Sequence, residues 1–192
     1  MHIGVDLDNT LLDATTAYLS IYNRVSGLAR TVGDLEKAHL WSLYGWTYEQ
    51  YAEMYARHGD EIHRSSLPRL GALEVVHDWY RKWQVTIITA RPAQFQDVTM
   101  AWLKKFEVPY HRIVFQVDKL AYCKAHDVDV LIDDGPHHAE QFALERWPFI
   151  LMDQPYNQYV MGPFIYRAHN WQEVRDYVEM LNVEDREVES KG

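Results

Sequence analysis

The segment from His2 to Leu12 constrains the fold more than any other part of the chain, because a short apolar run leads directly into two aspartates. Side chains two positions apart in an extended segment point to the same side, so Asp6 and Asp8 are expected to share one face at the end of a strand. Carboxylates this close repel each other unless a metal ion or a proton lies between them. Aspartates also follow strands as simple turn formers, so the pair by itself leaves both interpretations open.

The size and composition of the chain predict a globular protein. Its 192 residues, of which 47% are hydrophobic, suffice for one domain or for one domain with a large insertion. No apolar run is long enough to span a membrane, and we expect no signal peptide because the first residues lack a basic start followed by an apolar stretch. Cys123 is the single cysteine, so no intramolecular disulfide can form. We therefore expect it to pack in a helix and the protein to be cytoplasmic.

The formal net charge of −9 argues against a nucleic-acid polymer as the main partner, because polyanion binding needs a basic surface. A small phosphorylated substrate needs only a locally positive pocket, so the acidic balance does not exclude one. Part of the acidity lies in residues 184–192, which we expect to form a solvated and frayed tail.

Short β-rich runs alternate with helical patterns, which is typical of a parallel sheet covered by helices on both faces. After the first strand, strands are expected at residues 85–89, 113–116, 129–132 and 149–152, the last followed by a long loop. Helices are expected at residues 13–26, from 47 onward, and at 72–82, 93–105, 120–125, 139–145 and beyond 170, with a loop at 65–68. The helix-end signals are the N-cap Asp13, the stop at Gly27, and two capping boxes, Thr47 with Gln50 and Asn170 with Glu173.

One connection is too long for this pattern. A whole βαβ unit needs only about 30 residues, but residues 9–84 separate the first aspartates from the strand at Val85. The surplus is helix-patterned, so we expect residues 15–69 to form a helical subdomain inserted after the first strand. It would lie as a lid beside the sheet edge where α/β proteins bind ligands. Residues 1–14 and 70–183 would form the core.

Three of the expected strands end in polar functional groups, which a parallel sheet places along one edge. Asp6 and Asp8 follow the first strand, Thr89 ends the second, and Asp133 and Asp134 end another. Carboxylates attract a hard cation such as Mg²⁺, which commonly bridges to a substrate phosphate. A lysine that opens a helix, Lys119, adds an ammonium group that suits phosphoryl oxygens.

On these residues the chain resembles the haloacid dehalogenase superfamily of phosphatases. The four motifs are DLDNT with the following Leu-Leu-Asp, the threonine of IITAR, Lys119, and the acidic pair of VLIDDGP. The resemblance implies an α/β fold with a Rossmann-like core, a parallel sheet and a helical cap inserted after the first strand. Lys124 is the alternative to Lys119 as the third motif, and we favour Lys119.

The resemblance also implies a mechanism. Asp6 would attack the phosphorus and form an aspartyl-phosphate intermediate. Asp8 would donate a proton to the leaving alcohol and later remove one from the hydrolytic water. The pKa of Asp8 must then be high enough to hold a proton, and we expect the nearby charge of Asp6 to raise it. An Asp6→Asn variant should lose most of its turnover.

Mg²⁺ is the cofactor that the resemblance implies. Its ligands would be Asp6, the backbone carbonyl of Asp8, and Asp133 or Asp134.

Phosphoryl oxygens would be held by Thr89 and Lys119. Ala90 and Arg91, directly after the second motif, are further substrate-binding candidates, although Arg91 could instead form a surface ion pair.

Residues beside the first motif are expected to support it. Asn9 would serve the turn, and Thr10 would hold the motif by hydrogen bonding. None of the ten histidines has the spacing of a zinc site, and the neighbouring His137 and His138 point apart on any regular element. We expect structural or surface roles for the histidines.

The insertion is rich in aromatic residues, on which nucleobases stack well. Trp41, Tyr44 and Trp46 lie in a stretch without helical period and are candidates to face the substrate, whereas Tyr51 and Tyr55 are expected to pack the core of the insertion. Chain length, the position of the lid and the terminal pattern Arg167, Trp171, Val174 resemble the 5'(3')-deoxyribonucleotidase family. That family resemblance implies a nucleoside monophosphate as the substrate.

Two alternatives remain. The first is a phosphatase for another small metabolite or for the phosphorylated end of a nucleic acid. The second is a receiver-like signalling domain, which also combines an acidic cluster, a threonine and a lysine around a parallel sheet. Receivers carry their phosphorylated aspartate after the third strand and have no long insertion after the first, so the order of motifs here argues against that class.

Overall fold

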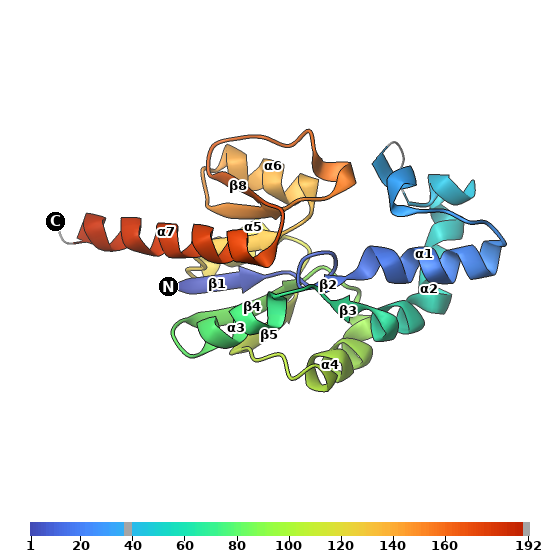
Figure 1. The fold of residues 1–192 in the computed structure, drawn as a ribbon, viewed down its shortest axis with the longest axis horizontal. Coiled ribbons are helices and arrows are strands. Elements are labelled where there is room, and N and C mark those ends of the chain that lie inside the picture. The colour runs from blue at the N-terminus through green and yellow to red at the C-terminus, as the bar shows by residue number, and fades with distance from the viewer. Residues whose placement is uncertain (37–39, 190–192) are drawn as a thin grey trace.

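The computed structural model describes residues 1–36 and 40–189. Its main sheet has six parallel strands in the order β5-β4-β1-β6-β7-β8 (Figure 1). The strands are β1 (His2–Val5), β4 (Gln84–Thr89), β5 (Arg112–Phe115), β6 (Val130–Asp133), β7 (Phe149–Met152) and β8 (Ile165–Ala168). The α/β fold with a parallel sheet is therefore confirmed. Because β1 lies between β4 and β6, the three strands that carry the predicted polar ends are neighbours.

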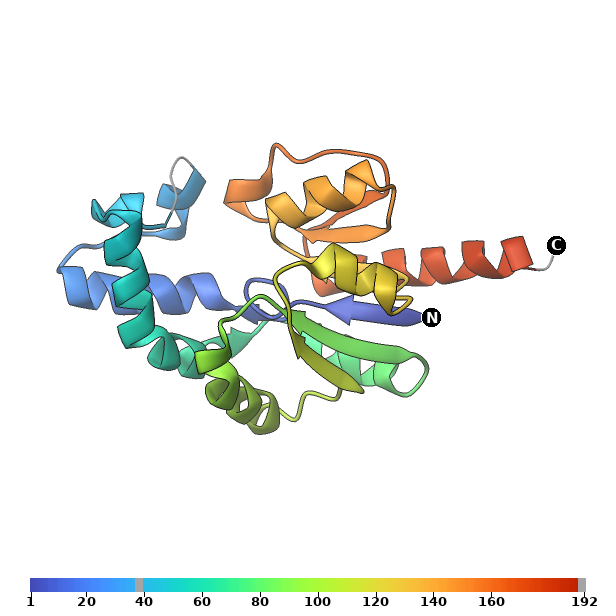
Figure 2. The ribbon, with the colours of Figure 1, turned by 180° about the vertical axis from the view of Figure 1, so that it is seen from behind.

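Helices cover both faces of the sheet. The helices in front of it in Figure 1 are α3 (Ala72–Tyr80) and α7 (Trp171–Glu189), and those in front in Figure 2 are α5 (Lys119–Ala125) and α6 (Pro136–Leu144). Successive residues of a strand point to opposite faces of the sheet, so one strand contributes side chains to the cores on both sides. Val130 and Ile132 join the cluster under α3 and α7, whereas Leu131 joins the cluster under α5 and α6.

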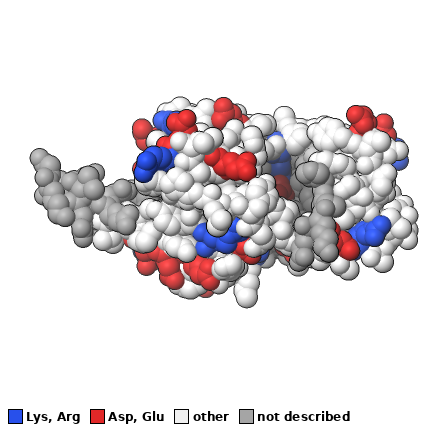
Figure 3. All heavy atoms as spheres, turned by 90° about the horizontal axis from the view of Figure 1, so that it is seen from above, with Lys and Arg blue, Asp and Glu red and all other residues white. Residues whose placement is uncertain are grey.

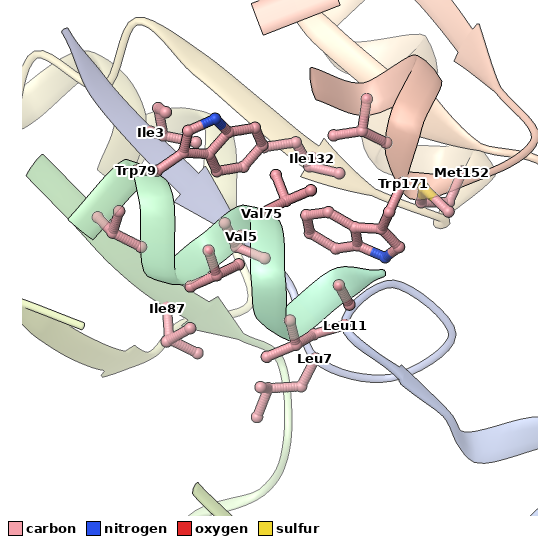
Figure 4. Packing of buried hydrophobic residues seen from close by; sticks show 14 of the residues in the cluster. Ile3, Val5, Leu7, Leu11, Val75, Trp79, Ile87, Ile132, Met152 and Trp171 are labelled. Atoms are coloured by element: carbon pink, nitrogen blue, oxygen red, sulfur yellow. The ribbon is translucent and has the colours of Figure 1, made fainter. Parts of the chain in front are cut away.

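The larger cluster packs two tryptophans onto the central strands (Figure 4). Trp79 of α3 and Trp171 of α7 lie with ring centroids 5.9 Å apart, over Val5 and Ile132. The indole N–H of Trp171 donates to the carbonyl of Thr10 at 3.1 Å, so this packing also holds the loop after β1. Truncating a buried tryptophan of this kind costs about 3–5 kcal/mol.

The smaller cluster contains Cys123, which is buried in α5. Burial raises the pKa of its thiol to about 12, so the group stays protonated at neutral pH. The cysteine therefore packs, as its helical position predicted.

Residues between β2 (Leu12–Asp13) and β3 (Leu67–Pro68) stand away from the main sheet in both ribbon views (Figures 1 and 2). They form α1 (Ala14–Ser26), the 3₁₀ turns η1 (Val32–Glu36) and η2 (Ser42–Tyr44), and α2 (Tyr48–Ser65). The predicted ends hold: Asp13 caps α1, Gly27 stops it with φ 73°, and Thr47 forms a full capping box with Gln50. We call residues 14–66 the insertion from here on.

The insertion has a small core of its own. Ile21 and Tyr22 of α1 and Ile62 of α2 are buried there, together with Leu43 and Tyr44 of η2. The rings of Tyr22 and Tyr44 meet edge to face, with their centroids 5.7 Å apart and their planes at 84°. Aromatic contacts of this kind stabilise small cores beyond the area that they bury.

Two expected loops contain strands. Leu67–Pro68 pairs antiparallel with Leu12–Asp13. Two residues are too few to show the apolar and polar alternation by which a strand is predicted from sequence. Ile165–Ala168 forms β8, where Arg167 interrupts the apolar run. This arginine binds the preceding loop, donating to Asp153, to Asn157 and to the carbonyl of Val160 at 2.6–2.9 Å.

The last helix begins and ends differently from the prediction. Asn170 accepts from the backbone N–H of Glu173 as expected, but the Glu173 carboxylate accepts from the N–H of His169, one residue before Asn170. Helix α7 continues to Glu189, although we expected residues from 184 onward to fray. Glutamate and arginine are good helix formers, which accounts for the continuation. Residues 190–192 of the predicted tail lie outside the described residues.

Acidic and basic side chains are interspersed on the face shown in Figure 3, and no extended basic area is visible among its described residues. Within the described residues, no helix has the length and apolar character needed to cross a lipid bilayer.

Candidate active site

The strand ends of β1, β4 and β6 meet at one edge of the sheet, as predicted. Val5 pairs with Ile87 and with Ile132, and the next residue, Asp6, donates its backbone N–H to the carbonyl of Ile132 at 2.9 Å. A cavity of about 640 Å³ opens at this edge. Among the residues that line it are Asp6, Asp8, Thr89, Ala90, Arg91, Lys119, Asp133 and Asp134.

Lys119 links two strands at the floor of this cavity. Its Nζ donates to Asp6 Oδ1 and to Asp133 Oδ2, both at 2.6 Å, and its side chain is only 2% exposed. Burial alone would lower the pKa of Lys119, but the attraction of Asp133 and Asp6 raises it, so the group stays charged. The alternative lysine, Lys124, lies outside the cavity and pairs at the surface with Glu145.

The floor holds more carboxylate than one ammonium can neutralise. Burial first, and then repulsion from the neighbouring aspartates, raise the pKa of Asp6 well above its usual range. The same causes raise the pKa of Asp134 to about 7. One oxygen each of Asp6, Asp133 and Asp134 lies within 4.8 Å of the others. Three converging oxygen ligands with surplus negative charge suit a hard divalent cation such as Mg²⁺.

Asp8 is held differently from Asp6. Arg91 makes a two-pronged contact with it, Nε to Oδ2 and Nη2 to Oδ1, both at 2.7 Å. Burial raises the pKa of Asp8, but the charge and hydrogen bonds of Arg91 outweigh burial and lower it below its ordinary value. The expectation that Asp6 would raise this pKa is therefore wrong, because the contact with Arg91 dominates the electrostatics at Asp8.

The second motif lies beside these carboxylates. Thr89 is buried, and its hydroxyl accepts from the backbone N–H of Arg91 at 3.2 Å, while Ala90 is exposed to the cavity. Arg91 is itself 5% exposed and also donates to the hydroxyl of Thr99 at 3.0 Å. The alternative of a surface ion pair for Arg91 is therefore wrong.

The opposite wall of the cavity comes from the insertion and consists of tyrosines. Tyr18 of α1 and Tyr48, Tyr51 and Tyr55 of α2 line it, with Ala52 and Ala56 between them. Tyr51 and Tyr55 stack almost parallel, with interplanar angle 4° and centroids 6.1 Å apart. Their positions four residues apart on one helix place them on the same face.

The two tryptophans that were predicted to face the substrate do not line this cavity. Trp46 stacks on Tyr44 at 4.8 Å and packs against Tyr22, and the ring of Trp41 lies 5.7 and 5.6 Å from the rings of Tyr48 and Tyr51. The stretch that holds them folds onto the core of the insertion, because η2 turns it back toward α1. Tyr44, also predicted to face the substrate, is buried in the core of the insertion, whereas Tyr51 packs against that core as predicted and, with Tyr55, also lines the cavity.

A histidine for which the sequence predicted only a structural or surface role lies at the junction of the two walls. His63 of α2 is fully buried, its Nε2 lies 3.0 Å from the hydroxyl of Tyr55, and its Nδ1 lies 3.8 Å from Asp8. Burial lowers the pKa of His63 to about 4. Tyr55, Gly59 and His63 recur every four residues, and this spacing was the signal that could have placed His63 on the face of α2 that meets the core.

The close approach of α2 to the core depends on Gly59. A Cβ at this position would lie 2.3 Å from the ring of Phe95, which follows the second motif. The rings of Tyr55 and His63 also contact Phe95, at 4.8 and 5.0 Å. The glycine therefore lets the insertion contact the sheet edge directly.

The residues beside the first motif form a second bridge. Asn9 adopts φ 56°, and its side chain bonds both to Thr15 and to the hydroxyl of Tyr156. Tyr156, which the sequence analysis did not single out, donates in turn to Asp134. The buried hydroxyl of Thr10 has no hydrogen-bond partner among the described residues, so the predicted support comes from its carbonyl, which accepts from Trp171.

The neighbouring histidines of α6 differ in their surroundings. His138 lines the cavity and its Nδ1 is buried without a hydrogen-bond partner among the described residues, whereas His137 is exposed. Their ring centroids lie 6.0 Å apart.

Comparison with known sequences finds relatives along nearly the whole chain. Residues 1–185 match the family described as 5' nucleotidase, deoxy (pyrimidine), cytosolic type C protein. A provisionally named nucleotidase of Halalkalibacterium halodurans is 28% identical over 182 residues, which cover 92% of this chain and 91% of that protein. A nucleotidase of Clostridium acetobutylicum is 24% identical over 183 residues, which cover 94% of this chain and 95% of that protein.

Solved structures share the fold at lower identity. A haloacid dehalogenase-like hydrolase from Streptococcus pneumoniae superposes with a TM-score of 0.67 at 13% identity, over 92% of this chain and 97% of that one. A provisionally assigned haloacid dehalogenase-type hydrolase from Bacillus subtilis, whose structure is bound to magnesium, gives a TM-score of 0.63 at 14% identity, over 94% and 98%. These likenesses confirm the fold that the four motifs predicted.

Proposed function

Because the chain belongs to the 5' nucleotidase, deoxy (pyrimidine), cytosolic type C family, and is therefore a phosphatase of the nucleotidase type, we propose that it is a 5'(3')-deoxyribonucleotidase that removes phosphate from nucleoside monophosphates. The family description also supports a cytoplasmic location. The substrate phosphate would enter the cavity at the sheet edge, and the nucleoside would extend toward the insertion.

Asp6 is the proposed nucleophile. One of its oxygens accepts from Lys119, and the other makes no hydrogen bond to the described residues, so it is free to attack the phosphorus. A new O–P bond forms as the ester O–P bond breaks, which gives an aspartyl-phosphate and the alcohol of the nucleoside. Water then hydrolyses the aspartyl-phosphate and regenerates Asp6.

Asp8 is the proposed proton donor and acceptor, two residues from the nucleophile. In its contact with Arg91 it is ionised, which is the form that takes a proton from the hydrolytic water. To protonate the leaving alcohol it must first gain a proton. A phosphate dianion that enters the cavity attracts the same guanidinium and repels the Asp8 carboxylate, and both effects favour that protonation.

The group at the acidic floor would be Mg²⁺, held by Asp6, the backbone carbonyl of Asp8, and Asp133 or Asp134. When bound, it would neutralise charge on the phosphoryl oxygens. Lys119 orients the carboxylates of Asp6 and Asp133 through its two hydrogen bonds and would place an ammonium group near the phosphate. The hydroxyl of Thr89, at the end of the neighbouring strand β4, would add a further donor.

The tyrosine wall supports a nucleoside as the leaving group. The side chains of Tyr48 and Tyr51 line the cavity, and aromatic rings can stack on any of the nucleobases. A phosphorylated sugar without a base would leave this wall unused. The charged groups at the floor therefore suit the phosphate of a nucleotide, and the aromatic rings across from them suit its base.

The observation that carries the proposal is the convergence of Asp6, Asp133 and Lys119 within hydrogen-bonding distance at one cavity. The test is a screen for phosphate release from deoxy- and ribonucleoside monophosphates and sugar phosphates, with and without Mg²⁺, with Asp6→Asn as the control. Preference for deoxynucleoside monophosphates that depends on Mg²⁺ is expected. Equal rates on all phosphates, or full activity of Asp6→Asn, would overturn the proposal.

A further inference from the structure

We propose that Tyr156 is a positioning residue for Asp134, and that it fixes this carboxylate in the orientation that binds the divalent cation. This inference rests on the metal site in the proposed function. Tyr156 belongs to the 3₁₀ turn η4 (Pro155–Asn157), in the loop after β7. Its hydroxyl contacts Asp134, one of the three carboxylates that converge at the floor of the cavity.

The direction of the hydrogen bond is set by a chain of donors that begins outside the cavity. The backbone N–H of Thr15 can only donate, and it donates to Asn9 Oδ1 at 2.9 Å. The other end of the Asn9 amide is therefore Nδ2, which donates to the hydroxyl oxygen of Tyr156 at 2.8 Å. Since that oxygen already accepts a hydrogen, the single hydrogen of Tyr156 is available for Asp134 Oδ2.

Tyr156 contacts the Asp134 carboxylate from outside the cavity. Asn9 and Asp134 line the cavity, but Tyr156 is not among the described residues that do so. It is therefore placed to hold one oxygen of Asp134 without occupying the space of a cation or a substrate. A carboxylate with one oxygen held has fewer orientations to lose when the other oxygen binds a metal ion.

The turn that carries Tyr156 is itself held firmly. Asn157 donates from Nδ2 to the carbonyls of Asp134 and Met152 at 2.9 and 2.8 Å, and Gln154 donates to the carbonyl of Asn9 at 3.2 Å. Arg167 of β8 donates to both the side chain and the carbonyl of Asn157. The hydroxyl of Tyr156 thus has a fixed position relative to β1 and β6.

The test is a measurement of cation binding without substrate. Mn²⁺ would be titrated into the full chain and followed by electron paramagnetic resonance, with Mg²⁺ as a competitor. Tyr156→Phe keeps the ring and removes the donor. We expect its cation dissociation constant to rise by roughly 10- to 100-fold, as for other partners that orient metal ligands. The matched control is Tyr159→Phe, three residues on and 66% exposed, which should bind as the wild type does.

Two further measurements separate positioning from a structural role. At saturating Mg²⁺ the kcat of Tyr156→Phe should recover, whereas general distortion of the site would leave it low. In an Asp134→Asn background, Tyr156→Phe should cause no additional loss of affinity, since its effect passes through that carboxylate. An unchanged dissociation constant for Tyr156→Phe, or an equal loss in the Asp134→Asn background, would overturn the proposal.

A second variant covers the case in which Tyr156→Phe does not fold. Asn9→Gly suits the backbone at φ 56° and removes the donor that orients the Tyr156 hydroxyl, so it should weaken cation binding in the same direction. Unchanged binding in that variant would count against the proposal. Failure of the nucleotide screen alone would refute the proposed function and leave this binding measurement valid.

Discussion

The two walls of the cavity use opposite chemistry. The sheet edge presents four carboxylates and two buried cations, and each charged group contacts an opposite charge or a fixed hydrogen-bond donor. The insertion presents tyrosine rings that lie in stacked or tilted pairs with centroids 5.9–6.3 Å apart. A network of buried charges tolerates little change, because removing one partner leaves the others unsatisfied. An aromatic wall tolerates exchange, so the walls should respond differently to mutation.

Replacing the proposed nucleophile tests the charged wall most severely. Asp6→Asn should lower kcat by roughly 10⁴-fold or more, because no other described carboxylate has a free oxygen in the same position. Phosphate release from the preferred nucleotide measures the loss. Asp153→Asn, directly after strand β7 of the same sheet and outside the cavity, is the matched control and should retain its turnover. Similar losses in both variants would contradict the role of Asp6.

Removing the ammonium group of the floor should cost stability. Lys119→Met leaves the buried carboxylates of Asp6 and Asp133 without their cation, and we expect the free energy of unfolding to fall by about 3–5 kcal/mol. Urea unfolding in the presence of a chelator measures this change. The matched control is Lys124→Met, which removes an exposed pair with Glu145 and should cost less than about 1 kcal/mol. Equal costs would show that the floor is not a stabilising network.

The junction between the walls should make stability depend on pH. The pKa of His63 is lowered to about 4 in the folded chain, from 6.5 for an exposed histidine. Between these two values His63 binds a proton in the unfolded chain but not in the folded chain. The free energy of unfolding therefore falls as the pH drops from about 6.5 toward 4, by up to roughly 3 kcal/mol. The measurement is the difference in unfolding free energy between wild type and His63→Gln across this range. A difference that does not change with pH would contradict the buried neutral imidazole.

The aromatic wall should give the smallest effect, and only with some substrates. Tyr48 is 63% exposed, so Tyr48→Ser should change stability little but remove a ring from the cavity. Loss of one stacking contact should raise KM for a nucleoside monophosphate by about fivefold or more. A sugar phosphate without a base is the control, and its KM should stay the same. Equal changes for both substrates would mean that the ring does not contact the base.

The sequence predicted the charged wall well because backbone geometry determines it. Once β1, β4 and β6 are neighbours in a parallel sheet, their carboxyl ends must lie together, and Asp6, Thr89 and Asp133 follow. The contact between Arg91 and Asp8 could not be foreseen, because residue types do not reveal which of several cations a carboxylate will bind. The effect of that contact on the pKa of Asp8 was missed for the same reason.

The aromatic wall was predicted poorly because helix faces depend on packing. Tyr51 and Tyr55 have a helical period, which is typical of a small core, yet their face of α2 turns toward the sheet edge. The orientation follows from the approach of Gly59 to Phe95, a contact between segments far apart in the sequence. Tyr156 was missed because its role depends on a loop without a regular pattern.

The short ribbon of β2 and β3 makes the molecule modular. Asp13 and Leu67 face each other in this antiparallel pair, and the N–H of Arg69 donates to the carbonyl of Leu11 at 2.9 Å. The chain therefore enters and leaves residues 14–66 at neighbouring positions. A two-residue turn is enough to connect two antiparallel strands such as β2 and β3, but here residues 14–66 connect them. In the proposed function, residues 14–66 supply the wall that contacts the nucleoside, so a different unit inserted at the same place would replace that wall while β1 keeps its pairing with β4 and β6.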